Sequence, residues 1–160
     1  MRHIIILVTV SLWCCGQATS QDIRSFFQTV ANNLRATLPP EAQCEKGVYG
    51  DPECTYTSSA GGTFNIRVGT NIDHVVYGFL NANPGNSPEA ERVGNLMFGF
   101  FEKQGFSVNA IHQCIQTMDH SQPSGSNKIE LGNGWSGSCT RNISAAGLAL
   151  IITMRPSGRF

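Results

Sequence analysis

Residues 54–80, CTYTSSAGGTFNIRVGTNIDHVVYGFL, decide the fold class of this 160-residue chain. β-Branched and aromatic residues recur there at alternate positions in three short runs, which is the pattern of half-buried strands. The runs are 55–57, 64–68 and 75–79. Turn sequences separate them, Ala60-Gly61-Gly62 and Gly69-Thr70-Asn71. Because strands joined by short turns pair in antiparallel fashion, the stretch predicts two successive hairpins.

A helix is predicted before this stretch. Asp22 is a suitable N-cap, and Pro39-Pro40 ends the segment. Between them, apolar residues recur at steps of three and four, the period of a helix with one apolar stripe. The stripe consists of Ile23, Phe26, Phe27, Val30, Leu34 and Leu38. Its few basic neighbours favour packing on its own domain over binding to a membrane surface.

Two helices and three strands are predicted after the stretch. Ser87-Pro88 starts the first helix, Gly105 ends it, and Ser107 caps a second helix that runs to Met118. Residues 119–127 are polar and rich in Ser, Pro and Gly, which predicts an exposed loop. The strands are expected around Ile129, around Cys139 and at Gly147–Met154. The last of them is nearly all apolar, which is typical of a central strand covered on both faces.

The order of elements is therefore α-βββ-αα-βββ. It predicts an α+β fold with one antiparallel sheet of about six strands and helices packed on one face. Residues 21–160 are expected to form a single globular domain, which is long enough to bury about two-thirds of the surface exposed by its unfolded chain. The two halves share an order of elements but no similar residues, so a duplication is only weakly indicated.

Residues 1–20 have the three parts of a secretory signal peptide. The basic start Arg2-His3 precedes an apolar run, Ile4 to Trp13, that is too short to span a bilayer. Ala18 and Ser20 then place small residues where the peptidase requires them, so cleavage is expected after Ser20. No second long apolar run follows. The mature chain is therefore expected to be secreted or periplasmic, with no transmembrane segment.

Of six cysteines, Cys14 and Cys15 fall in the signal peptide. Neither follows the small residue that lipoprotein processing expects, which makes lipidation a minor alternative. The other four predict two disulfide bonds in an oxidising compartment. Three pairings exist, and the favoured one joins Cys44 to Cys54 across a turn and Cys114 to Cys139 from helix to sheet. No Cys-x-x-Cys or finger-like spacing supports a metal site.

Composition excludes two classes of protein. The chain has 11 Lys+Arg against 11 Asp+Glu, and the basic residues are scattered, whereas a nucleic-acid surface needs them on one face. The hydrophobic fraction of 41% is high enough to form a core, which excludes a disordered chain.

Residues 132–137, Gly-Asn-Gly-Trp-Ser-Gly, match the glycine spacing of dinucleotide-binding loops. The context does not fit, because a strand and not a helix is predicted to follow, and no acidic residue occurs after Glu130. No cofactor is therefore expected. A Gly-rich hairpin is the better interpretation, with Trp135, Asn133 and Gly134 as candidate binding residues. The alternative for Trp135 is that it folds back into the core.

Candidate catalytic groups are few. His112, Asp119 and His120 could hold a metal or act as acid and base, but a solvated helix end, with His120 at the negative end of the dipole, is the simpler interpretation. Asp73 and His74 are adjacent, and neighbours on a strand point to opposite faces. No Gly-x-Ser-x-Gly or His-Glu-x-x-His signature is present. An enzyme is therefore less expected than a binding protein, and no catalytic residue is assigned.

Three hypotheses of function follow. The first is an exported, disulfide-stabilised interaction module that contacts another extracytoplasmic macromolecule through loops 81–87, 119–127 and 132–137. The second is a small hydrolase or metal-dependent enzyme that uses the three residues named above, and the third is a structural envelope component. Asn142-Ile143-Ser144 is a glycosylation sequon that has meaning only in a eukaryote.

Overall fold

The computed structural model describes residues 20–58, 65–82, 87–131, 134–145 and 147–157. Within these residues there are three helices, α1 (Ser20–Thr37), α2 (Ser87–Lys103) and α3 (Val108–Gln116). The strands are β1 (Gln43–Lys46), β2 (Pro52–Thr57), β3 (Asn65–Thr70), β4 (Val76–Ala82), β5 (Ser124–Glu130), β6 (Trp135–Ser144) and β7 (Gly147–Pro156).

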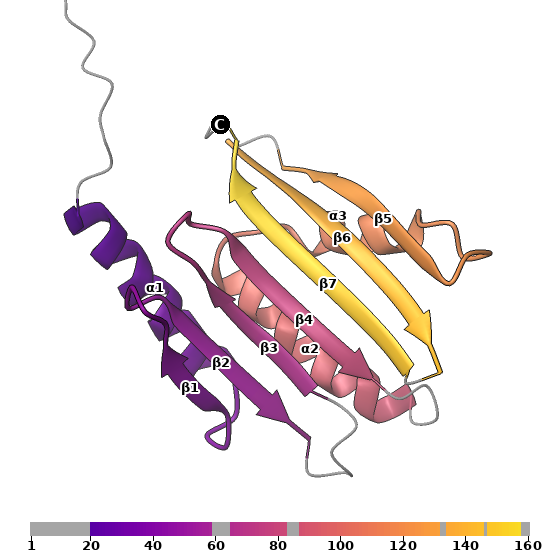
Figure 1. Cartoon of the computed structure of the whole chain (residues 1–160), viewed down its shortest axis with the longest axis horizontal. Coiled ribbons are helices and arrows are strands. Elements are labelled where there is room, and N and C mark those ends of the chain that lie inside the picture. The colour runs from indigo at the N-terminus through magenta and orange to yellow at the C-terminus, as the bar shows by residue number, and fades with distance from the viewer. Residues whose placement is uncertain (1–19, 59–64, 83–86, 132–133, 146, 158–160) are drawn as a thin grey trace, which may run out of the picture.

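All seven strands form one sheet in the order β1-β2-β3-β4-β7-β6-β5, and every pair of neighbours is antiparallel. The helices lie on one face of this sheet, α2 behind β3 and β4 and α3 behind β5 and β6 (Figure 1). Helix α1 packs on β2, β3 and α2. The predicted α+β class, single antiparallel sheet and one-sided helices are confirmed.

The strand β7 is central, as its apolar sequence predicts. It lies between β4 and β6, and its side chains alternate between two environments. Leu150, Ile152 and Met154 are buried under the helices, whereas Ile151 and Thr153 are half-buried on the other face.

The sheet has one strand more than the sequence indicates. All four residues of β1 are exposed, so this edge strand lacks the alternation of apolar residues by which strands are recognised. It is held by backbone pairing to β2, with Cys44 directly opposite Cys54. The order of elements is therefore α-ββββ-αα-βββ.

Several predicted boundaries are also corrected. The predicted loop 81–87 begins inside β4, which includes Asn81 and Ala82, and the predicted loop 119–127 ends inside β5, which begins at Ser124. Asp73 and His74 lie in the β3–β4 turn and not on a strand. There His74 has a φ of 59° and packs its ring edge-on against Phe26 of α1, 4.7 Å between centroids. The predicted turn 60–62 falls outside the described residues.

The helix ends follow local chemistry. The Ser107 hydroxyl accepts a hydrogen bond from the amide of Ala110 at 3.3 Å, so Ser107 caps α3 as predicted. Gly105 has a φ of 85°, which lets the chain leave α2 in a left-handed conformation. Helix α1 begins two residues before Asp22, which therefore lies in its first turn.

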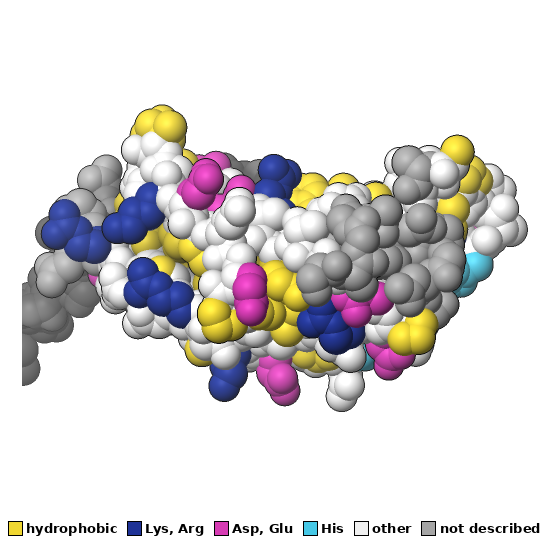
Figure 2. Space-filling model, turned by 90° about the horizontal axis from the view of Figure 1, so that it is seen from below, with side chains coloured by type: hydrophobic (Ala, Val, Ile, Leu, Met, Phe, Trp, Pro, Cys, Tyr) yellow, Lys and Arg dark blue, Asp and Glu magenta, His cyan; other side chains and the backbone are white. Residues whose placement is uncertain are grey.

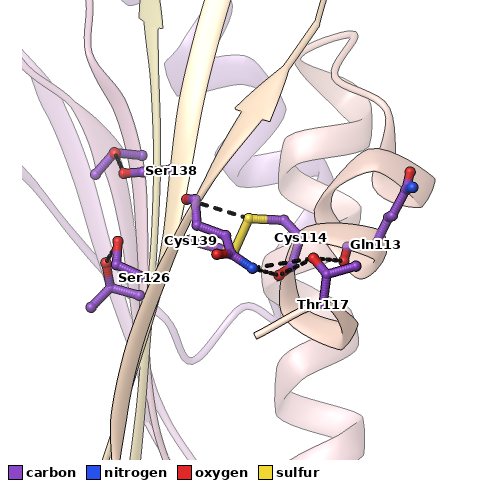
Figure 3. The surroundings of a disulfide bond; sticks show 9 residues. Gln113, Cys114, Thr117, Ser126, Ser138 and Cys139 are labelled. Atoms are coloured by element: carbon purple, nitrogen blue, oxygen red, sulfur yellow. Dashed lines mark hydrogen bonds between the residues drawn. A yellow bond between two sulfur atoms is a disulfide. The ribbon is translucent and has the colours of Figure 1, made fainter. Parts of the chain in front are cut away.

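The core fills the space between the helices and the sheet. Its largest fully buried side chains are Phe100, Phe101, Leu34, Ile66, Met97, Ile111, Ile129, Ile152 and Met154. Both predicted disulfides are present. Cys44–Cys54 links β1 to β2, and Cys114–Cys139 ties α3 to β6 with Cα atoms 6.3 Å apart. The second bond is buried between the helix and the sheet (Figure 3).

Candidate functional site

The turn between β1 and β2 carries two exposed apolar side chains. We call residues 47–51 the hairpin tip. In it Val48 is 95% exposed and Tyr49 is 68% exposed, the two highest exposures among the large hydrophobic side chains that the structure describes. Apolar side chains this exposed and next to each other gain nothing from the fold, so they are available to a partner.

Hydrogen bonds within the hairpin tip define its turn. The amide of Gly47 donates to the carbonyl of Asp51 at 2.8 Å, and the amide of Gly50 donates to the carbonyl of Gly47 at 2.9 Å. The Asp51 carboxylate also accepts from the amide of Tyr49 at 3.2 Å. The Cys44–Cys54 bond closes the hairpin just below these contacts. A turn that is already ordered by these hydrogen bonds and by the disulfide loses little conformational entropy when it binds a partner.

A shallow groove of about 250 Å³ separates the hairpin tip from α1. Its lining includes the apolar side chains of Ile23 and Phe27 from α1 and two basic residues, Arg24 and Lys46. The hairpin tip and this groove together form an apolar surface bordered by positive charge.

The face of the sheet opposite the helices is uncovered over the described residues and differs in chemistry from the hairpin tip. Alternate residues of all seven strands point out of it, and in Figure 2 the upper surface of the molecule sinks between two raised ends. One depression on this face, which we call the polar hollow, has a volume of about 620 Å³ and lies over β5, β6 and β7. Its side chains include Lys128, Glu130, Ser136, Ser138, Thr153 and Arg155.

Hydroxyl groups in and beside the polar hollow are paired across strands. Ser138 of β6 lies 2.8 Å from Thr153 of β7, and Ser126 of β5 lies 3.0 Å from Thr140 of β6, measured between hydroxyl oxygens. Ser126 and Ser138 point away from the Cys114–Cys139 bond, which lies on the helix side of the sheet (Figure 3). The pairs fix the rotamers of these hydroxyls and leave each pair with one further proton to donate.

Beside the polar hollow, the open face carries a cluster on β2, β3 and β4. The Tyr77 hydroxyl donates to the Glu53 carboxylate, and the Arg67 guanidinium lies 4.7 Å from the ring centre of Phe79. Partial burial, followed by the hydrogen bond to Glu53, raises the pKa of Tyr77 well above its ordinary value. The phenol therefore stays protonated and acts as a donor, not as a base.

The structure describes two of the three candidate binding residues of the Gly-rich segment, Trp135 and Gly134. Trp135 is the first residue of β6 and is half-buried, with its ring edge-on to Phe106 at 5.0 Å between centroids. Gly134 is exposed and has a φ of 80°, as a tight turn requires. Asn133 lies outside the described residues. Much of the Trp135 ring is therefore used in packing, and its role in binding stays a prediction.

The candidate catalytic residues make separate contacts. His112 packs edge-on against Phe98 of α2, 4.8 Å between ring centroids. The carboxylate of Asp119 accepts hydrogen bonds from the hydroxyl and amide of Ser121, which lower its pKa. His120 bonds through Nδ1 to the buried guanidinium of Arg141. Across the described residues, no group of three or more His, Cys, Asp or Glu could hold a metal ion.

Arg141 explains why the loop before β5 has a defined shape. Besides His120, its guanidinium donates to the carbonyls of Asp119 at 2.9 Å and Gln122 at 3.0 Å. Arg141 is 6% exposed, so these bonds replace water around the two terminal nitrogens of a buried guanidinium, while its Nε makes no hydrogen bond. Asp119 and His120 are thus positioned by a structural arginine, and His112 takes no part in that network.

A second ionic cluster joins α2 to the end of β2. Glu89 accepts from Arg92 at 2.7 and 3.0 Å and from the buried hydroxyl of Ser58, while Arg92 also donates to Tyr56 at 2.9 Å. The bond from Arg92, followed by that from Ser58, lowers the pKa of Glu89 from 4.5 to about 2.

Glu89 should therefore contribute to acid stability. A carboxylate whose folded pKa is depressed stabilises the native state above its unfolded pKa, and this contribution is lost as the pH falls from 4.5 to about 2. We expect the melting temperature of the wild type to fall more steeply over this range than that of Glu89→Gln. Thermal unfolding followed by circular dichroism at stepped pH measures both slopes. Identical slopes would show that Glu89 is not linked to folding.

No family model, no curated protein and no solved structure matches this chain. None of the described helices is long and apolar enough to cross a membrane. Sequence reasoning missed both the hairpin tip and the polar hollow. A signal existed for the first, because an apolar pair, Val48-Tyr49, stands between glycines in an otherwise polar turn. The polar hollow could be predicted only from the register in which β5, β6 and β7 pair, and the sequence does not show that register.

Proposed function

We propose that the protein is an exported, disulfide-stabilised binding module that attaches to a protein partner through its hairpin tip. The observation that carries the proposal is the exposure of Val48 and Tyr49, 95% and 68%, on a braced turn. Secretion is supported by the signal-like residues 1–20 and by two disulfides, which persist in oxidising compartments.

The chemistry of the surface indicates the chemistry of the partner. Tyrosine is enriched among the residues that dominate binding energy, and such residues insert into well-packed apolar pockets. Arg24 and Lys46 border the groove beside the hairpin tip, so the complementary pocket should be apolar with an acidic rim. Burying an apolar side chain such as Val48 is worth about 1.5–3 kcal/mol, and the Tyr49 ring adds further apolar area.

The partner can be found by photo-crosslinking from the hairpin tip. A photoreactive amino acid is placed at position 49 and, as a control, at the exposed Asn142 of β6, and both proteins are added to the native extracytoplasmic fluid. We expect one protein adduct from position 49 that position 142 does not form. Mass mapping of the same preparation should find both disulfides and a chain that starts after Ser20.

The identified partner then permits a quantitative test. Val48→Ser combined with Tyr49→Ser is expected to weaken its binding about 100-fold, which corresponds to about 2.7 kcal/mol. The matched control is Ile143→Ser, since Ile143 is also apolar and exposed, 46%, but lies on β6. Surface plasmon resonance measures both. Equal affinities for the two variants would contradict the proposal, as would recovery of the natural protein from reducing cytosol with Met1 intact.

Trp135 is tested in the same assay. If Trp135→Ala weakens the complex while the hairpin-tip variant does not, the partner binds at the Gly-rich segment and the hairpin tip has no part in binding. Because Trp135 packs on Phe106, the melting temperature of this variant is measured alongside its affinity.

A further inference from the structure

The strand β5 forms one edge of the sheet and pairs only with β6 among the described strands (Figure 1). It is seven residues long, and no proline interrupts it. A sheet edge of this length is ready to pair with a further strand unless it is shortened, charged with one sign or covered. The strand at the opposite edge, β1, has only four residues. The edge of β5 is therefore the longer of the two pairing surfaces that the described sheet offers.

Alternate residues of β5 direct their backbone amide and carbonyl groups away from the sheet. The amide of Ile143 in β6 donates to the carbonyl of Pro123 at 2.7 Å, just before β5 begins. In an antiparallel ladder, residues that bond to the partner strand alternate with residues whose backbone groups point the other way. When the register is continued from this bond, Ile129 bonds to β6, whereas Lys128 and Glu130 point outward.

These two outward residues carry opposite charges. Lys128 and Glu130 are both exposed, and their side chains lie on the open face of the sheet. None of the ion pairs or side-chain hydrogen bonds between described residues involves either of them. If two copies of β5 pair in antiparallel fashion about a two-fold axis at Ile129, Lys128 of each copy lies opposite Glu130 of the other. The dimer then contains two cross-strand pairs of opposite charge.

The same register satisfies the backbone. Because Lys128 and Glu130 both point outward, each Lys128–Glu130 pair exchanges two backbone hydrogen bonds between the copies. An axis moved by one residue, to Lys128, would instead set two lysines directly opposite each other, which is destabilising. The charges on β5 therefore select one register for self-pairing.

The layer of helices permits this approach. Helix α3 lies behind both β5 and β6, so the axis would place the two α3 helices two strand spacings apart, about 10 Å (Figure 1). This is close to the usual distance between packed helices. A groove of about 250 Å³ lies between α3 and the edge of β5, and its lining includes Ala110, Gln113, Thr117 and Ile129. The second copy would close this groove.

We propose that the protein forms a symmetric dimer in which the two β5 strands pair edge to edge, with Lys128 of each copy opposite Glu130 of the other. The paired segment is short, so a weak dimer is expected, with a Kd of about 10 µM. A strand from another protein would need the same Lys-x-Glu spacing to complement this edge, and β5 itself contains it. The hairpin tip lies beside the opposite edge strand and stays uncovered in both copies.

Sedimentation equilibrium tests the dimer on the oxidised protein, expressed with its own residues 1–20 and recovered after export. The wild type should pass from monomer to dimer between about 1 and 500 µM. Lys128→Glu and Glu130→Lys should each weaken self-association about 30-fold, because two attractive pairs become two repulsive ones. The matched control is Glu45→Lys, a charge reversal on the exposed strand β1, which should leave the Kd unchanged.

A mixture of the two β5 variants tests the register. When Lys128→Glu and Glu130→Lys are combined in equal amounts, position 128 of each chain again faces an opposite charge at position 130 of the other. Heterodimers should therefore form with about the wild-type Kd, although each variant alone associates weakly. A dimer that uses any other surface would not show this rescue.

Amide hydrogen exchange locates the contact in the wild type. Exchange at Lys128 and Glu130 should slow about fivefold between 10 and 500 µM protein, whereas exchange at Ile129, already bonded to β6, should not change. Three results would overturn the inference: a wild type that stays monomeric, single variants that dimerise like the wild type, or a mixture that does not dimerise. Sedimentation needs no partner protein, so each result leaves the role of the hairpin tip separately testable.

Discussion

Replacing Cys114 and Cys139 together by alanine is expected to lower the free energy of unfolding by about 3 kcal/mol. The bond joins residues 25 apart, and its loss releases that loop in the unfolded chain. In the folded protein it is the covalent link between α3 and β6, and both cysteines are buried. Urea denaturation of the oxidised wild type and of the double variant measures the difference.

The matched control for this experiment is the replacement of Cys44 and Cys54 by alanine. That bond spans only 10 residues and holds an exposed edge strand, so its loss should cost less. It should also affect binding through the hairpin tip more than global stability. If the two double variants lost the same stability, the constraint between α3 and β6 would have no special role.

Gly78→Val is expected to destabilise the protein by about 3 kcal/mol. Gly78 is on the helix face of β4, and a Cβ there would come within 2.8 Å of both Met97 Sδ and Phe101 Cε2. Any side chain there must therefore displace the packed side chains of Met97 and Phe101, which hold α2 against the sheet. The midpoint and slope of a denaturant titration report the change.

Two variants make the test of Gly78 specific. Gly94→Ala, in α2 itself, should be neutral or stabilising, because its nearest contact would be Leu80 at 3.6 Å and alanine favours the helix. Phe101→Leu should recover part of the loss when combined with Gly78→Val, since the two groups compete for one space. Strict additivity would mean that Gly78→Val acts elsewhere.

The fold could be predicted to the level of class and order because most elements carry their own signal. Ser107 caps α3, the stripe of α1 faces the core, and β7 is central, each in agreement with a pattern in the sequence. Strand β1 could not be predicted, because its four residues are exposed and its place is set by pairing with β2. A local sequence pattern does not predict a strand whose position is set by contacts with other strands.

The difference between local patterns and tertiary contacts also explains why the sequence did not show where the candidate site residues lie. His112, Asp119 and His120 are close in sequence, yet Arg141, more than 20 residues later, decides where His120 lies and Phe98 decides where His112 lies. Trp135 stands among glycines, but Phe106 from a distant helix end holds its ring. The groups that gather in the polar hollow come from three strands, so only the sheet register brings them together.

The pairing of β4 with β7 has a consequence for the order in which the parts of the chain fold. Every other ladder in the sheet joins strands consecutive in sequence, whereas this one pairs Val76 with Met154. The consecutive hairpins have low contact order and can form early, but the central ladder must close a loop through α2, α3 and two further strands. We expect the two halves to become structured first and their docking to limit the folding rate. Pulse-labelling hydrogen exchange should then protect amides of β2 and β3 before those shared by β4 and β7, and simultaneous protection would exclude this order.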